Sequence, residues 1–327
     1  MPIIKKKSSV LPLASLLPCV RGRYQPEYPL AKSVWLRVGG RAAVLYKPAD
    51  IEDLCTFLKQ KPAEVSYTLI GAGSNVLIRD GGIDGVVIRL DRGFSDITVQ
   101  EDRLIVGAGA LDRNVALTAA EAGLGGLEFL IGIPGRLGGA VVMNAGAYGR
   151  EIKDILIECI VVDPAGKQHI LTPADLGFSY RHSSLPAGWI VVRATLLGVP
   201  TPKEGIMTRI QEILKAREDT QPIRARTGGS TFKNPISFPQ KKAWELIDEA
   251  GCRGWTRGGA MISEKHCNFL INKGSATAKD LESLADDVQR KVLDCTGVQL
   301  EWEIRKLGTS DEKKERSHDA RSSAAPT

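Results

Sequence analysis

Arg181 is a candidate for binding a carboxylate. It lies in the polar run of residues 179–183, where we expect an apolar strand to end. A guanidinium group is always charged and can hold a planar carboxylate through two parallel hydrogen bonds. A surface arginine in an ordinary ion pair is the alternative interpretation.

Ser230 is a candidate proton donor. It follows Gly228 and Gly229 and is followed by Lys233 and Asn234 in a dense, turn-like polar run. A serine hydroxyl is a poor acid at neutral pH, but it can protonate a strongly basic carbanion. The alternative is a turn serine that bonds its own backbone.

Two glutamates, Glu301 and Glu303, alternate with apolar residues in an expected strand over residues 298–305. A period of two places both on the same face. Spacing alone does not choose between them, and a solvated strand edge would give the same pattern.

A glycine-rich stretch over residues 132–149 is the element around which these side chains could be arranged. Glycine at this density indicates special backbone geometry or close approach, for example a ligand lying on main-chain N–H groups. The segment also carries Ile133, Leu137 and Val141, which a solvent loop rarely would. We therefore predict a buried cofactor or phosphate site there.

A second glycine turn, residues 71–75, follows an expected strand. It departs from the dinucleotide-binding fingerprint, because Val76 stands where the third glycine would be and leads into another strand instead of a helix. Consecutive N–H groups in such a turn could still bind a pyrophosphate, although a plain tight turn fits as well.

The remaining pattern alternates short strands with a few helices. We expect a strand over residues 34–42, a helix after the N-cap Asp50, and a helix over 243–250 closed by Gly251. A further amphipathic helix is expected over 279–293.

Composition describes an ordinary globular chain of 327 residues with a net charge of +6. No basic stripe interleaved with aromatic residues is present, which argues against a nucleic-acid surface. The six cysteines and four histidines show no metal-ligand spacing, so we expect reduced, mostly buried thiols and no metal site. No apolar run is long enough to span a membrane.

Together these motifs resemble the UDP-N-acetylenolpyruvoylglucosamine reductase family. Each motif is weak alone, but the set is specific and keeps the family's order between about residues 16 and 308. The matching stretches are RVGG at 37–40, GAGSNVL at 71–77, IPGRLGGA at 133–140, NAGAYG at 144–149, YRHS at 180–183, GSTFKNP at 229–235 and EIR at 303–305.

The resemblance implies an α+β fold with a vanillyl-alcohol-oxidase-like (PCMH-type) FAD-binding domain and a smaller α+β substrate-binding domain. With the composition shift at 198–202 and the charged tail, we predict an N-terminal arm with a capping helix at 1–32, the FAD domain at 33–200, the substrate domain at 201–308 and a disordered tail at 309–327.

The implied activity is that of a UDP-N-acetylmuramate dehydrogenase of peptidoglycan synthesis that acts in the cytoplasm, and cell shape and division would depend on it. We expect a monomer and leave an oligomer open. NADPH would give hydride to the flavin N5, which passes it to C3 of UDP-N-acetylglucosamine enolpyruvate. Ser230 would protonate C2, and Arg181 and Glu303 would stabilise the developing charge. The family's glutamate directly precedes Ile/Val-Arg, which selects Glu303.

The resemblance also implies binding positions. Lys233 and Asn234 would hold polar groups of the substrate. The implied FAD contacts are Gly71, Ala72, Gly73, Ser74, Asn75, Val76, Leu77, Gly132, Ile133, Pro134, Gly135, Gly138, Gly139, Asn144, Ala145 and Gly146.

Two features depart from many relatives. Arg150 stands where they have glycine, and the chain lacks the extra tyrosine-bearing substrate loop, so it resembles the family's shorter branch. His182 and His266 are expected to pack rather than to contact ligand. An FAD-domain oxidase or electron-transfer subunit, or a non-catalytic flavin or nucleotide-sugar binder, is the competing interpretation. The set of Arg181, Ser230 and Glu303 argues against both.

Overall fold

The computed structural model describes residues 12–310. The start of the predicted N-terminal arm and residues 311–327 of the predicted tail lie outside the described residues. Within the arm, the predicted capping helix is a single short 3-10 helix, η1 (Leu13–Leu16).

The described chain contains α-helices, short 3-10 helices and mostly short strands. The α-helices are α1 (Ile51–Gln60), α2 (Asp112–Glu121), α3 (Leu137–Val142), α4 (Pro173–Leu176), α5 (Lys203–Thr220), α6 (Ala243–Glu249) and α7 (Ala278–Thr296); the other 3-10 helices are η2 (Leu30–Ser33), η3 (Arg92–Phe94), η4 (Glu128–Gly132) and η5 (Ile152–Asp154). The strands are β1 (Arg23–Pro29), β2 (Arg41–Lys47), β3 (Tyr67–Leu69), β4 (Val76–Ile78), β5 (Ile83–Ile88), β6 (Ile97–Gln100), β7 (Arg103–Gly107), β8 (Leu124–Gly125), β9 (Gly146–Ala147), β10 (Arg150–Glu151), β11 (Leu156–Val162), β12 (Gln168–Leu171), β13 (Ile190–Leu197), β14 (Val199–Pro200), β15 (Arg226–Ser230), β16 (Thr256–Arg257), β17 (Ala260–Ile262), β18 (Phe269–Asn272) and β19 (Arg305–Leu307).

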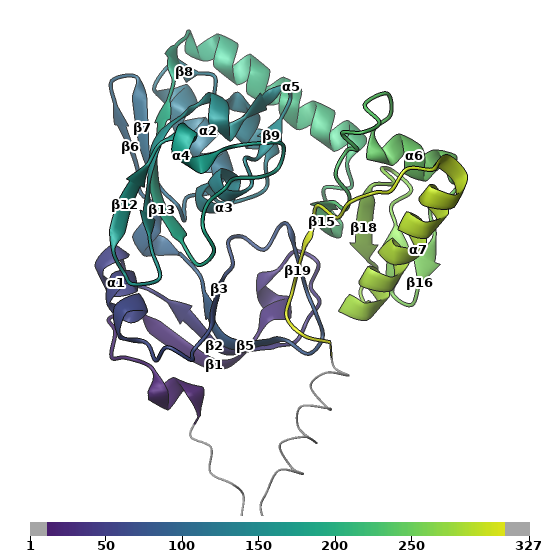
Figure 1. The fold of residues 1–327 in the computed structure, drawn as a ribbon. Coiled ribbons are helices and arrows are strands. Elements are labelled where there is room, and N and C mark those ends of the chain that lie inside the picture. Colours follow the sequence, from purple (N-terminus) through teal and green to yellow (C-terminus); the bar gives the residue numbers. More distant parts are fainter. Residues whose placement is uncertain (1–11, 311–327) are drawn as a thin grey trace, which may run out of the picture.

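Two sheets share the largest core in the first part of the chain (Figure 1). One has the order β1-β2-β5-β3, with β5 parallel to both of its neighbours, and the other is antiparallel with the order β12-β11-β13-β7-β6. Their apolar faces and the buried side of α2 form one continuous cluster. This core holds the glycine-rich stretch against β7 and β13, because Gly138 N donates to Ala108 O and α3 packs on β13.

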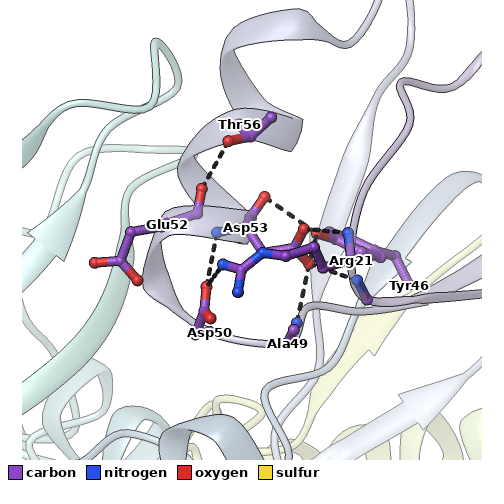
Figure 2. Close-up of polar contacts among 8 residues, drawn as sticks. Arg21, Tyr46, Ala49, Asp50, Glu52, Asp53 and Thr56 are labelled. Carbon is purple, nitrogen blue, oxygen red and sulfur yellow. Dashed lines mark hydrogen bonds and ion pairs between the residues drawn. The ribbon is translucent and has the colours of Figure 1, made fainter.

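A buried carboxylate ties the N-terminal segment to α1 (Figure 2). Asp50 is the predicted N-cap and accepts from Asp53 N, which confirms that expectation. The Asp53 carboxylate in turn accepts from the backbone N–H groups of Arg21 (2.6 Å), Gly22 (2.8 Å) and Ala49 (2.9 Å) and from the Tyr46 hydroxyl (2.8 Å). These bonds fix where the chain enters β1.

Residues 226–296 form a separate layer of a sheet and two helices. The sheet has the order β15-β18-β17-β16, and α6 and α7 pack together beside it. The predicted inward face of α7 is confirmed, since Leu281, Leu284 and Val288 are buried. Gly251 adopts the predicted left-handed conformation after α6, with φ of +70°.

The two parts of the molecule are interlocked rather than merely linked. β19 returns from the C-terminal layer and pairs in parallel with β4, as Figure 1 shows in yellow. The Asp80 carboxylate accepts from Ala278 N and Lys279 N, both at 3.0 Å, and so caps α7 from the first part. α5 follows the predicted domain boundary, yet Ile206, Ile210 and Ile213 belong to the first core.

The predictions of three strands are wrong. Residues 34–40 form an irregular crossing segment; it is apolar because Leu36 and Val38 are buried in the C-terminal core. Residues 178–185 turn tightly at Arg181, whose φ is +55°, after the short helix α4. Residues 298–304 have no continuous strand partner within the described chain, because the Gln289 side chain bonds Leu300 O and Trp302 instead.

Two segments that the sequence analysis treats as turns or loops are regular elements in the structure. Residues 226–230 form strand β15, whose glycines lie beside the cavity described below, and residues 137–142 of the glycine-rich stretch form the short helix α3. All six cysteines are free within the described chain, but Cys19 and Cys295 are exposed.

Candidate active site

A cavity of about 770 Å³ lies between the two parts of the molecule. Its wall contains the turn at 71–76, the glycine-rich stretch, the end of β15 and the segment that leads into β19. Arg181, Ser230 and Glu303, which are far apart in sequence, all line it. The structure therefore brings the three predicted side chains to one place.

Arg181 and Glu303 form a direct ion pair at this wall. The Nε of Arg181 donates to Oε1 of Glu303 at 3.0 Å, and its side chain also donates to Gly146 O at 2.9 Å. The tight turn closed by the backbone pairing of Ser179 and His182 aims the guanidinium inward. Both side chains of the pair keep less than a fifth of their surface exposed.

Burial and charge act in opposite directions on Glu303. Loss of solvent raises the pKa of its carboxyl, while the charges of Arg181 and Lys233 and the Arg181 hydrogen bond lower it; the net pKa is raised. Glu301, by contrast, is 74% exposed and pairs with Lys233 at 3.5 Å. The period-two expectation that both glutamates share one face is wrong, because this segment is not a regular strand.

Ser230 is held by the neighbouring strand and by Glu303's own backbone. It pairs with Phe269 of β18, and Gly229 before it has a φ of +79°, a conformation that suits glycine. The next residue, Thr231, accepts at its carbonyl from Glu303 N at 2.8 Å. One short backbone bridge thus couples the candidate proton donor to the candidate carboxylate.

The turn at 71–76 is hydrogen-bonded to the backbone of Glu303 and Arg305. Asn75 donates from Nδ2 to Glu303 O at 3.2 Å, and its own carbonyl accepts from Arg305 N at 3.1 Å. Gly73 is required here, since a Cβ would come within 2.3 Å of Ser33 O. The turn that is expected to hold the cofactor and the residue expected to hold substrate charge are therefore adjacent.

The cavity wall leaves open space beside its main chain, as a bound cofactor would require. At Gly71, Gly139 and Gly229, a Cβ would meet no heavy atom within 4 Å, so glycine leaves space on the cavity side at each of these positions. A buried carboxyl, that of Asp112, also faces this space without a partner within the described residues. Both observations indicate room for ligand atoms against the main chain.

Most predicted cofactor positions line the cavity: Gly71, Ala72, Gly73, Ser74, Asn75, Val76, Gly132, Ile133, Pro134, Gly135, Gly138, Gly139, Ala145 and Gly146. Leu77 and Asn144 are not part of its wall. Leu77 packs in the C-terminal core. Asn144 is fully buried and ties Glu151 and Ser179 together, both at 3.0 Å, behind the turn that carries Arg181.

The two predicted substrate contacts also lie outside the wall. Lys233 pairs with Glu301, and Asn234 accepts from Ala243 N at 3.0 Å at the start of α6. Of the two histidines, His182 lines the cavity, whereas His266 packs against Phe269 and Trp244. Arg150 lies in β10 beyond the wall.

Sequence reasoning missed several wall residues, including Asp112, Arg217, Gln221 and Arg305. Arg217 comes from the last turn of α5 and bonds Gln221 Oε1 at 3.2 Å, and burial lowers its pKa. No ion-pair partner of Arg217 is found in residues 12–310. In the sequence, only the position of Arg217 near the end of an amphipathic helix, just before residues 221–222, could have indicated that it reaches the cavity.

Comparison with known proteins gives one consistent family. Residues 221–307 match the model described as UDP-N-acetylenolpyruvoylglucosamine reductase, C-terminal domain, and residues 42–172 match the FAD binding domain model. The UDP-N-acetylenolpyruvoylglucosamine reductase of Parvibaculum lavamentivorans is 53% identical over 301 residues, which is 92% of this chain and 96% of that protein. The protein of the same name from Acidiphilium cryptum is 56% identical over 292 residues, 89% of this chain and 94% of that protein.

A solved structure agrees with this result. The UDP-N-acetylenolpyruvylglucosamine reductase of Thermus caldophilus is 39% identical and superposes with a TM-score of 0.76 over 89% of this chain and all of that one. The expected fold, an α+β chain with a PCMH-type FAD-binding domain followed by a smaller α+β layer, is confirmed.

Proposed function

The chain belongs to the UDP-N-acetylenolpyruvoylglucosamine reductase family, and from that premise we propose how its cavity performs the reaction. The activity is the FAD-dependent, NADPH-driven reduction of UDP-N-acetylglucosamine enolpyruvate to UDP-N-acetylmuramate, a peptidoglycan precursor. The observation that carries the division of roles below is the convergence of Arg181, Ser230 and Glu303 on one glycine-lined cavity.

FAD, when bound, supplies the hydride chemistry that connects NADPH to the enolpyruvyl C3. The turn at 71–76 and the glycine-rich stretch would hold it, because their main chain borders the cavity without side chains in the way. We propose that the first part of the chain is the FAD-binding domain, that the C-terminal layer binds substrate, and that α5 joins them.

Arg181 is assigned to the substrate carboxylate. Its guanidinium is positioned by Glu303 and by Gly146 O, so it does not have to be reorganised when charge develops on the substrate. Hydride arriving at C3 leaves enolate-like charge on C2 and the carboxylate. A fixed cation in a partly dry site stabilises such charge more strongly than water does.

Glu303 is assigned a role as a neutral donor to the same charge. An ionised carboxylate would oppose negative charge on the substrate, whereas a protonated one can donate a hydrogen bond to it. The raised pKa of Glu303 favours the protonated form at higher pH than a free glutamate would allow. Its backbone bonds to Asn75 and Thr231 keep it in place.

Ser230 is assigned the proton transfer to C2. The hydroxyl lines the cavity at the end of β15, and a carbanion-like carbon is basic enough to take a proton from it. The serine oxygen would then recover a proton from solvent.

Arg217 is assigned to an anionic group of the nucleotide-sugar or of NADPH. It is the partly buried cation that α5 presents to the cavity, and desolvation makes an anion a favourable partner for it. Lys233 and Asn234 would then act by holding the chain that follows Ser230, through Glu301 and the start of α6.

A cytoplasmic location, a part in cell shape and division, and a monomeric state belong to the proposal as well. Within residues 12–310, no helix has both the length and the apolar character that crossing a membrane demands.

Anaerobic stopped-flow spectroscopy tests the function. The flavin absorbance of the FAD-loaded protein should be bleached by NADPH and restored by UDP-N-acetylglucosamine enolpyruvate. Restoration by oxygen but not by that substrate would instead support an oxidase with the same fold.

A further inference from the structure

Asp112 is a buried acid for which the protein provides no partner. It is the first residue of α2, has no exposed surface and lines the cavity. Neither carboxyl oxygen has a hydrogen-bond partner among residues 12–310. Because buried polar groups are almost always satisfied, this carboxyl points to ligand atoms.

The glycine-rich stretch shapes the space around this carboxyl. Asp112 N donates to Gly135 O at 3.2 Å, and a Cβ on Gly135 would lie 2.6 Å from Asp112 Oδ2. Glycine at position 135 therefore leaves room for the carboxyl at the cavity wall. The neighbouring Arg136 is not available as a counter-ion, since it bonds Leu90 O, Gly109 O and Asp91.

The ligand group that contacts Asp112 must be able to hydrogen-bond a buried carboxyl that has no counter-ion. A pyrophosphate does not, because it has no hydrogen-bond donor to offer the carboxyl and the main-chain N–H groups of the glycine turns serve it better. We propose that Asp112 binds a pair of hydroxyl groups of the bound FAD. This inference rests on the proposed function, from which it takes the cofactor.

The protonation of the carboxyl supports hydroxyl groups over N–H groups. Burial raises the pKa of Asp112 well above its usual range. A protonated carboxyl must donate one hydrogen bond and accept another, and a hydroxyl can do both. An amino or imide N–H of the cofactor can only donate.

FAD carries hydroxyl groups in two places, the ribityl chain of its flavin half and the ribose of its adenosine half. FMN retains the first and lacks the second. Comparing the affinities for FAD and FMN therefore shows whether the ribityl or the ribose hydroxyl groups bind Asp112.

The test measures dissociation constants of FAD and FMN for apoprotein by flavin fluorescence. Asp112→Leu, similar in shape but apolar, should bind FAD about 10- to 100-fold more weakly, as expected for two lost hydrogen bonds. Asp112→Asn, which still donates and accepts, should stay close to wild type. Asp96→Asn, an exposed acid before α2, is the control.

The melting temperature of the apoprotein separates ligand binding from a structural role. Without FAD the carboxyl is an unsatisfied buried group, so the Asp112→Leu apoprotein should melt at or above the wild-type temperature. A lower melting temperature of that apoprotein, with FAD affinity unchanged, would overturn the proposal. So would Asp112→Asn binding FAD as weakly as Asp112→Leu.

The comparison of FAD with FMN then decides which hydroxyl groups Asp112 binds. Weaker binding of both FAD and FMN would assign Asp112 to the ribityl chain, and weaker binding of FAD alone would assign it to the ribose. Wild-type apoprotein that bound neither would contradict the cofactor assignment itself, and not only the role of Asp112.

Discussion

At the scale of single residues, Glu303 shows how the fold sets the protonation of a side chain. Its carboxyl has lost most of its solvent, and Arg181 compensates only in part, so the pKa is raised. A raised pKa means that the protonated form persists below that pKa and is lost as the pH rises through it. If Glu303 acts as a neutral donor, this titration must appear in the substrate half-reaction.

Glu303→Gln is expected to remove that titration. In the wild type, reoxidation of the flavin by the enolpyruvyl substrate should slow as the pH rises through the pKa of Glu303, above that of a free glutamate. A glutamine keeps a neutral donor and does not titrate, so the same limb of the pH–rate profile should be flat. A limb that persists unchanged in the variant would exclude Glu303 as its origin. Glu301→Gln, at an exposed position, is the matched control.

Residue types in sequence predicted Arg181 and Ser230 as candidates but not how they are held. The sequence pattern places Arg181 at the end of a strand, whereas in the structure it lies in a turn with a positive φ, which the residue type alone does not reveal. Asp112 could not be predicted, because an acid in the first turn of a helix is ordinary. Only the packing against Gly135 shows that this acid has no partner.

At the scale of elements, α1 and the N-terminal segment depend on the Asp53 carboxylate (Figure 2). Burial alone would raise its pKa, but hydrogen bonds from the Ala49 and Arg21 backbone, from Tyr46 and from Gly22 lower it overall. A lowered pKa contributes stability above the unfolded-state pKa, and this contribution is lost as the pH falls through the folded-state pKa.

Asp53→Asn is therefore expected to lower the free energy of unfolding at neutral pH by about 1–3 kcal/mol. An amide presents N–H groups to the donors of Ala49 and Tyr46. Chemical denaturation at neutral and acidic pH checks this: the difference between variant and wild type should shrink as the solution becomes acidic. A difference that is the same at both pH values would show that the Asp53 charge does not matter.

Helices with strong periodicity or caps were predictable from sequence, as α1 with Asp50 and α7 with its apolar face show. Strands that depend on distant partners were not. Residues 34–40 and 298–304 carry the apolar content of strands because they are buried between larger elements. Local patterns do not distinguish burial by packing from burial in a sheet.

At the scale of the whole molecule, the two parts are joined at a seam beside the cavity. Asp80 caps α7 from the first part, Arg79 pairs with Glu282 of α7, and β19 pairs with β4. The seam includes the hydrogen bond from Asn75 to the Glu303 carbonyl, so the turn proposed to hold the cofactor is attached to the residue proposed to stabilise substrate charge.

Asp80→Ala should weaken this seam. The loss of a two-bond helix cap is expected to lower the free energy of unfolding by about 0.5–2 kcal/mol. It should also raise KM for the enolpyruvyl substrate while the dissociation constant of FAD changes little. Asp84→Ala, at an exposed position after the same turn, should change neither value. Equal losses of FAD and substrate binding would argue against a seam that mainly positions the C-terminal layer.

The measurement that decides most directly whether these three residues form the working site is a comparison of the two half-reactions in Ser230→Ala. Reduction of the flavin by NADPH should proceed at the wild-type rate, because it needs no proton from Ser230. Anaerobic reoxidation by UDP-N-acetylglucosamine enolpyruvate should slow about 10²- to 10⁴-fold, and Ser230→Cys, which keeps a donor proton, should recover part of that loss. Reoxidation of Ser230→Ala at the wild-type rate would contradict the proposed site.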